Sequence, residues 1–256
     1  MGISYGRAMD EQVTGQRLEA SLVRMCAPAL LGAKPANMFT FVGKYADADQ
    51  VAVGRMQGAR GYVCPGERDG DCACRPCPCS LVEGRRSELS RAVRSFDRIL
   101  QDHGVRVRVV AWRSFGAIVL AYRPQMLAEH LADERMQAAL ERLGYPVWQA
   151  MGGDAGEMSL LMLGQQLDHL SQRFAAEKLP HEVGFFLGYP YEDVMGFVRH
   201  RGRRYRYSGC WKVYGDPRPA VRLFARYRRC TRRCERLRNT GATLIDIVAF
   251  HRFFEM

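Results

Sequence analysis

Apolar side chains recur every three or four residues along several stretches of the chain, a pattern that predicts amphipathic helices. The clearest case is residues 87–103, where Leu89, Val93 and Leu100 share one face and Gly104 provides a C-terminal stop. Residues 1–10 are expected to form a loose tail. The other predicted helices cover residues 11–25, 124–131, 133–144, 157–174, 217–238 and 242–254, and one more begins at residue 190.

Short apolar runs bounded by turn residues predict five β-strands, over residues 38–42, 105–112, 116–122, 183–187 and 207–214. The join between the second and third runs is short and polar, so these two are expected to form a hairpin, which excludes a purely parallel sheet. The sequence therefore predicts a single α/β or α+β domain over residues 1–256. We expect a mixed sheet of about five strands, including one hairpin, flanked by several helices.

Residues 44–85 break this pattern, because they contain six glycines and a dense run of cysteines. We interpret them as an insertion, and a long irregular segment in a compact domain is usually functional or disordered. Thiolates bind zinc, Cu(I) and iron–sulfur clusters, although a zinc ribbon needs two separated pairs of ligands. Two interpretations of this cysteine run are therefore kept: a zinc or iron–sulfur site, and a redox-sensitive or disordered loop. The candidate metal ligands are Cys64, Cys72, Cys74, Cys77 and Cys79.

Composition restricts the class of protein further. Apolar residues make up 47% of the chain and charged residues 25%, as in ordinary globular proteins. No apolar run is long enough for a membrane span, and the charged first twenty residues lack the apolar core of a signal peptide. We expect a cytoplasmic protein, in which nine cysteines, an odd number, serve as thiols or metal ligands and not as a disulfide framework.

Positive charge is concentrated in the C-terminal quarter. Between residues 199 and 238, fifteen lysines and arginines face only Asp216 and Glu235, a local net charge of +13 in a chain whose total is +11. With interspersed aromatic residues such as Tyr205 and Tyr227, this region is a candidate for binding nucleic acid through phosphates and stacked bases. A solvated basic helix face is the alternative.

Several catalytic motifs are absent from the sequence. The chain has no Walker-type phosphate loop, no dinucleotide-binding glycine fingerprint after a strand and no nucleophile elbow. His181 and Glu182 are adjacent, but the second histidine of a zinc-protease helix is missing. The sequence therefore does not indicate a P-loop nucleotidase, a dinucleotide-dependent enzyme, an α/β-hydrolase or a zinc protease.

Residues 180–197 combine an ionisable pair, an apolar run, a glycine and a helix start. The pattern predicts a strand, a turn at Gly188 and a helix after Pro190, with Glu192 and Asp193 near the positive end of the helix dipole. Such turns often bind ligands in α/β proteins, because free N–H groups point into the cleft. An ordinary structural βα unit is the alternative.

This segment also resembles a signature of the bacterial family called domain of unknown function 3793. Three further segments resemble the family in the same order, and together the four cover roughly residues 20–240: 26–39, 119–124, 180–197 and 209–216. The resemblance implies a compact cytoplasmic bacterial protein and brings no activity with it. In the family pattern a histidine often precedes the first cysteine, whereas Met25 stands here, so a His–Cys pair at that position is in doubt.

A catalytic hypothesis combines Cys26, His181 and Glu182. A cysteine needs a base or an electropositive setting to become a thiolate at neutral pH, and His181 could act as that base with Glu182 orienting its ring. The alternative is a purely structural role, in which Cys26 packs in the core and His181 hydrogen-bonds a backbone carbonyl. The sequence alone does not decide between them.

Our leading functional hypothesis is the binding of a small anionic ligand, with turnover left open, at a pocket near these three residues. The second hypothesis is a nucleic-acid-binding or protein-interaction module, and the third is a metal or redox module. Substrate and oligomeric state are not specified by the sequence. The candidate ligand-binding residues are Lys34, Tyr189, Asp193, Trp211 and Lys212.

Overall fold

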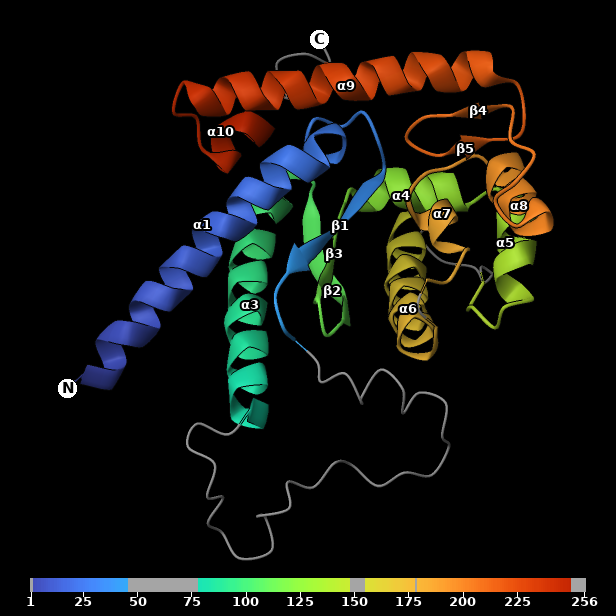
Figure 1. Ribbon diagram of the computed structural model, residues 1–256. Helices are drawn as coiled ribbons and strands as arrows, with labels where there is room; N and C mark the ends of the chain where they lie inside the picture. Colours follow the sequence, from blue (N-terminus) through green and yellow to red (C-terminus); the bar gives the residue numbers. More distant parts are fainter. Residues whose placement is uncertain (1, 46–77, 148–154, 178, 250–256) are drawn as a thin grey trace, which may run out of the picture.

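Figure 1 shows the computed structural model of the chain, which describes residues 2–45, 78–147, 155–177 and 179–249. For residues 2–11, 78–81 and 155–158 it describes the backbone alone. The helices are α1 (Gly2–Leu30), α3 (Pro78–Leu100), α4 (Pro124–Leu131), α5 (Glu134–Glu141), α6 (Ala155–Ala176), α7 (Val183–Phe186), α8 (Tyr191–His200), α9 (Pro217–Asn239) and α10 (Leu244–Ala249). The strands are β1 (Ala36–Val42), β2 (Arg106–Trp112), β3 (Gly116–Tyr122), β4 (Tyr207–Ser208) and β5 (Lys212–Val213), and a 3₁₀ turn covers Gln101–His103.

The central sheet has three strands in the order β1-β3-β2, and all neighbouring strands are antiparallel. The predicted hairpin is confirmed, because β2 pairs with β3 with one irregularity between Val109 and Ala111. Strand β1 pairs along the other edge of β3, from Ala36 opposite Tyr122 to Val42 opposite Gly116. The expectation of one mixed five-stranded sheet was wrong, since β4 and β5 form a separate two-stranded ribbon.

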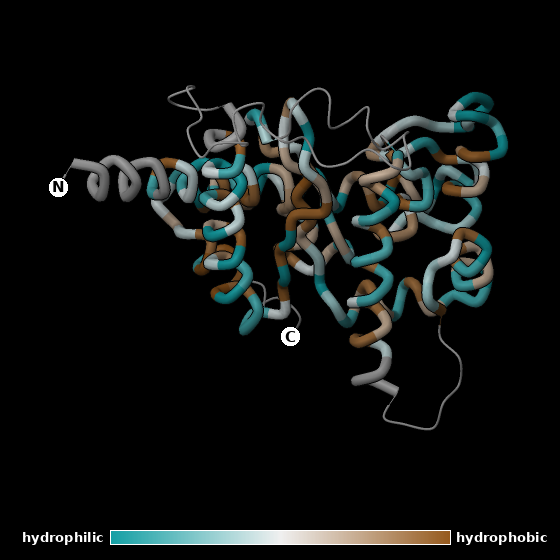
Figure 2. Tube along the Cα trace, turned by 90° about the horizontal axis from the view of Figure 1, so that it is seen from below, coloured by the Kyte–Doolittle hydropathy of each residue, from teal (hydrophilic) through white to brown (hydrophobic). Residues whose placement is uncertain are grey.

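Helices cover both faces of this sheet, and alternating residues of β3 face them. Val119 and Ala121 belong to one buried cluster with apolar residues of α1, α3 and α10. Leu120 belongs to a second cluster with residues of α4, α5, α6 and α7. Figure 2 shows the hydrophobic stretches gathered along the central strands, with hydrophilic stretches on the outer helices. The class is α+β, because the sheet is antiparallel and the helices lie outside it.

The long helix α9 runs across one end of these layers, over the C-terminal end of α1 and the ribbon β4–β5 (Figure 1). It begins at the Asp216 cap, whose side chain accepts a hydrogen bond from the backbone N–H of Arg218. Beneath it lies a third apolar cluster that includes Trp211, Phe224 and Tyr227. Among the described helices, none has the length and apolar character needed to cross a membrane.

Two of the predicted strands differ in the structure. Residues 183–187 contain the short helix α7, all four of whose residues are buried. A brief apolar run does not distinguish a buried strand from a buried helical turn by periodicity. Residues 207–214 form the ribbon β4–β5 and its turn instead of one strand, because Gly209 and Cys210 reverse the chain there.

The N-terminal helix is longer than predicted at both ends. Helix α1 begins at Gly2, so the expected loose tail was wrong, and it continues past Cys26 to Leu30 with Pro28 inside it. The helix was expected to end at residue 25, but it includes Pro28 in its last turn, where this residue has no N–H to donate to the preceding turn. Helix α3 also begins earlier than predicted, at Pro78, so the end of the expected insertion is helical.

Candidate functional site

Lys34 lies in the turn between α1 and β1 and is only 4% exposed. Its ammonium group sits over two aromatic rings, 5.0 Å from the centroid of Tyr189 and 5.7 Å from that of Tyr227. Across the described parts of the chain, it forms no hydrogen bond and no ion pair with a carboxylate. A buried cation without a counter-ion is costly, so this position is unusual.

The environment of Lys34 weakens its positive charge. Burial lowers its pKa to about 8, although the nearby thiols of Cys210 and Cys26 act in the opposite direction. Burial also raises the pKa of Tyr189 and of Tyr227 to about 12. Both phenols therefore stay protonated at neutral pH, and neither supplies a negative charge to Lys34.

Lys34 lines a cavity of about 460 Å³, which we call the first cavity. Helix α9 contributes Arg228 and Arg232, which are four residues apart and so share a helix face. The end of α1 and strand β1 close the cavity on the other side. The remaining lining residues are Met25, Pro28, Asn37, Met38, Leu187, Tyr189, Cys210, Tyr227 and Thr231.

A second cavity of about 430 Å³ adjoins the first, because Met38, Leu187, Tyr189 and Cys210 line both. It lies between α7, α8 and the ribbon β4–β5. Besides Tyr189, three predicted site residues with ionisable side chains line it, and its other walls are mainly apolar. These three are His181, Asp193 and Lys212.

Asp193 holds the ribbon against α8. Its carboxylate accepts hydrogen bonds from the indole N–H of Trp211 at 2.7 Å and from the backbone N–H groups of Tyr214 at 2.7 Å and Gly215 at 3.2 Å. Trp211 then stacks on Tyr189 with 4.7 Å between ring centroids. Asp193 thus fixes the aromatic wall that reaches Lys34.

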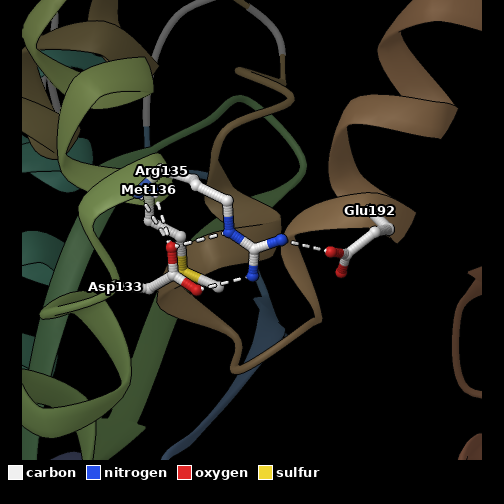
Figure 3. Close-up of polar contacts among 4 residues, drawn as sticks. All are labelled: Asp133, Arg135, Met136 and Glu192. Atoms are coloured by element: carbon white, nitrogen blue, oxygen red, sulfur yellow. Dashed lines mark hydrogen bonds and ion pairs between the residues drawn. The ribbon is translucent and has the colours of Figure 1, made fainter.

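The start of α8 is anchored on its outer side as well. Arg135 donates to both carboxylate oxygens of Asp133, the cap of α5, and to Glu192 in the first turn of α8 (Figure 3). The guanidinium of Arg135 lowers the pKa of Asp133 to about 2. Arg135 thereby links the two helix starts, with Asp193 buried and Glu192 exposed to solvent.

Glycines permit two close approaches at this site. Gly188 has φ +73°, and a Cβ there would lie 2.8 Å from Cδ of Pro35, the neighbour of Lys34. A Cβ on Gly209 would lie 2.2 Å from the ring of Phe224. The loop before α8 and the turn of the ribbon can therefore approach the Lys34 turn and α9 only with glycine at these positions.

The structure does not bring the three residues of the catalytic hypothesis together. Cys26 is fully buried in the cluster of α1, α3 and the sheet, and burial raises the pKa of its thiol. Glu182 accepts hydrogen bonds from Tyr145 at 3.1 Å and Arg173 at 2.8 Å, which connect α7 to α6. Neither residue lines either cavity, whereas His181 lines the second one.

The predicted ligand-binding residues are better grouped. Lys34 and Tyr189 line the first cavity, and Tyr189, Asp193, Trp211 and Lys212 line the second. The ammonium of Lys212 donates to the carbonyl of Gly202 at 2.7 Å, so it is already engaged. Their role in binding stays a prediction.

The predicted metal ligands cannot be placed. Cys64, Cys72, Cys74 and Cys77 lie outside the described residues, and of Cys79 only the backbone, in the first turn of α3, is described. Elsewhere, the described side chains form no group of three histidine, cysteine or acidic residues able to hold a metal ion.

Sequence reasoning missed Tyr227, Arg228, Arg232 and Cys210 as lining residues of the first cavity. The arginines were recognised only as part of a basic region. Their spacing of four, next to an aromatic residue within an arginine-rich helix, was the one available signal. Which face of α9 lies over Lys34 depends on tertiary packing, so the sequence could not select these residues among the others.

Comparison with known proteins adds a family but no activity. Searches of the curated proteins and of the solved structures found no match. A family model described as protein of unknown function (DUF3793) matches residues 22–248, which is most of the chain and contains every residue of both cavities. The chain therefore belongs to the DUF3793 family.

Proposed function

We propose that the protein binds a small organic anion in the first cavity, through Lys34, Arg228 and Arg232. The observation that carries this proposal is the ammonium of Lys34, which is buried, faces the cavity and has no carboxylate partner among the described residues. Folding alone does not explain such a group, because its burial costs stability. A bound anion would offset that cost.

The other groups of the cavity fit the same kind of ligand. Guanidinium groups bind carboxylates and phosphates through paired hydrogen bonds, and Arg228 and Arg232 offer two of them from one helix face. The rings of Tyr189 and Tyr227 suit the carbon skeleton of an organic ion. The adjoining second cavity leaves room for a larger, mostly apolar portion.

The test compares two double variants of α9 by titration calorimetry with phosphate, pyruvate and lactate. The variant R228A/R232A removes the cavity arginines, whereas R222A/R236A removes two equally exposed arginines that line neither cavity. Loss of two charge-assisted contacts is expected to weaken binding about a hundredfold in the first variant. The second variant should bind like the wild type.

Equal weakening in both variants would show a diffuse effect of net charge and would contradict the proposal. Failure of all three anions to bind the wild-type protein would contradict it as well. Low salt in the titrations makes the comparison stringent, since distant charges then act most strongly.

A second candidate function is the binding of nucleic acid by exposed arginines of α9 that do not line the first cavity. Four such arginines carry this candidate, and only Asp216 and Glu235 oppose them on this helix and its cap. Retention on single-stranded DNA or RNA would then fall steeply with salt, and R222A/R236A would lower that dependence while R228A/R232A would not. The four are Arg222, Arg226, Arg229 and Arg236.

The setting we propose is the reducing cytoplasm of a bacterial cell. All four cysteines whose side chains are described are free thiols, which agrees with that setting: Cys26, Cys210, Cys230 and Cys234. The metal or redox module of residues 44–85 stays a separate prediction. Metal analysis of the purified chain, with and without residues 60–80, tests it.

A further inference from the structure

We propose that Lys34 is a nucleophilic lysine that condenses with the carbonyl group of an anionic oxo acid or aldehyde held in the first cavity. This inference rests on the proposed function and specifies its ligand class. Its geometric basis is a lysine that is 4% exposed and lines the first cavity together with arginines that can bind the ligand's anionic end. The amine and the anion-binding groups thus face one volume.

The choice of lysine at this position supports the inference. The chain contains four lysines and thirty-four arginines, so arginine supplies almost all of its positive charge. A guanidinium cannot lose its proton in a protein, but a buried lysine can, and the neutral amine is the nucleophile. The buried cationic position on the cavity wall is the one that carries lysine, while the exposed ones on α9 carry arginine.

The surroundings favour the neutral amine. The groups that face Lys34 from the packed elements are Cys26 of α1, Tyr189 before α8, Cys210 of the ribbon turn, and Tyr227, Arg228 and Arg232 of α9. The buried thiol and the two phenols are neutral at pH 7, and the arginines are positive. Burial lowers the pKa of Lys34 to about 8, so about one tenth of the lysine is free amine at pH 7 and about half at pH 8.

The reaction balances without any further reagent. The nitrogen lone pair of Lys34 attacks the carbonyl carbon, a C–N bond forms, and the carbonyl oxygen takes up a proton. The resulting carbinolamine loses the oxygen as water and leaves a Schiff base between Lys34 and the ligand. The carboxylate or phosphate of the ligand stays on Arg228 and Arg232, which keep their charge throughout.

The experiment treats the full-length protein with pyruvate and sodium cyanoborohydride, and peptide mass mapping then locates the reduced adduct. Lactate, which has the same charge and nearly the same size but no carbonyl, is the matched ligand control. We expect an adduct at Lys34 in the wild type and in K44R, and its loss in K34R. Pyridoxal 5′-phosphate is a second carbonyl probe, with pyridoxine 5′-phosphate as its control.

The four lysines make the result easy to interpret, and the wild-type map is decisive even if K34R does not fold. If pyruvate and lactate both bind but neither carbonyl probe is trapped at Lys34, this inference fails and the proposed function stands. Adducts spread evenly over all lysines would also overturn it. If no probe binds and none is trapped, both the inference and the proposed function fail.

Discussion

A single buried ammonium distinguishes the first cavity from the rest of the molecule. Two buried carboxylates elsewhere are paired: Glu182 with Arg173 and Tyr145, and Asp193 with Trp211 and two backbone N–H groups. Lys34 has only the faces of two aromatic rings, and such contacts recover a small part of the cost of burial. At the scale of the residue, burial of the Lys34 ammonium lowers the stability of the fold at the position where the ligand is proposed to bind.

Replacing Lys34 with methionine should therefore stabilise the free protein. The pKa of Lys34 falls from 10.5 to about 8 on folding, so at pH 7 the buried charge costs up to about 3 kcal/mol. Methionine has a similar length and no charge to bury. Urea unfolding at pH 7 measures the free energy of unfolding, and a gain of about 1–3 kcal/mol is expected for K34M.

The same pKa shift predicts how this gain depends on pH. Below pH 8 the lysine is protonated in both the folded and unfolded states, so the cost is fully present. Between pH 8 and 10.5 the unfolded state binds more protons, and the wild type gains stability as pH rises. The advantage of K34M should shrink across that range. A K34M variant less stable than wild type at pH 7 would contradict this interpretation.

Gly188 is expected to tolerate no side chain. Its φ of +73° and the 2.8 Å approach to Pro35 mean that G188A must strain the backbone and push against the Lys34 turn. We expect a loss of about 1–3 kcal/mol in thermal or urea unfolding, together with weaker anion binding. The control is G164A, because Gly164 lies in α6 with open space around it, and alanine there should stabilise the helix.

At the scale of the element, one carboxylate connects α8, the ribbon β4–β5 and the aromatic wall. Removing it in D193A leaves the indole N–H of Trp211 and two backbone N–H groups without their acceptor. A loss of about 2–4 kcal/mol is expected, with a change in tryptophan fluorescence as Trp211 leaves Tyr189.

The neighbouring carboxylate provides the control for that variant. Glu192 is exposed and pairs with the exposed Arg135, so E192A should leave stability and fluorescence nearly unchanged (Figure 3). Equal effects of D193A and E192A would show that the charge at the start of α8 matters, and not the inward hydrogen bonds. That outcome would remove Asp193 from its proposed positioning role.

The elements that could be predicted from the sequence are those with long, consistent patterns. The hairpin β2–β3 and the helices α4, α6 and α9 are confirmed, because several turns or alternations support each one. Helix α7 was not predictable, since four buried apolar residues fit either a strand or a helical turn. The ribbon β4–β5 was merged into one strand because its two strands have only two residues each.

The residues of the site were predicted in part, because local sequence patterns identify some of them and tertiary packing selects the others. Lys34, Tyr189 and Trp211 lie in segments with distinctive composition, and the structure brings them into contact. Cys26 and Glu182 were equally plausible catalytic residues in the sequence. In the fold, Cys26 is buried in the core and Glu182 pairs with Arg173, and neither property can be inferred from the local sequence. The choice of Arg228 and Arg232 depends on how α9 is rotated over the turn at Lys34, which no local pattern encodes.

At the scale of the whole molecule, the strong positive charge of α9 is divided between arginines that line the first cavity and arginines that do not. Arg228 and Arg232 line it, although both are also exposed, whereas the exposed Arg222, Arg226 and Arg229 line neither cavity. A small anion and a polyanion would therefore compete little for the same groups. The paired double variants separate the two functions for this reason.

The most direct measurement of the central claim is an NMR titration of the lysine side chains against pH, with and without lactate or phosphate. With four lysines in the chain, the resonance of Lys34 can be assigned from K34R. We predict that Lys34 titrates near pH 8 in the free protein and that a bound anion raises its pKa, because the anion favours the ammonium form. Lys44, which lines neither cavity, is the control residue. A Lys34 that titrates near 10.5 and ignores both anions would contradict the claim that it is a buried anion-binding group.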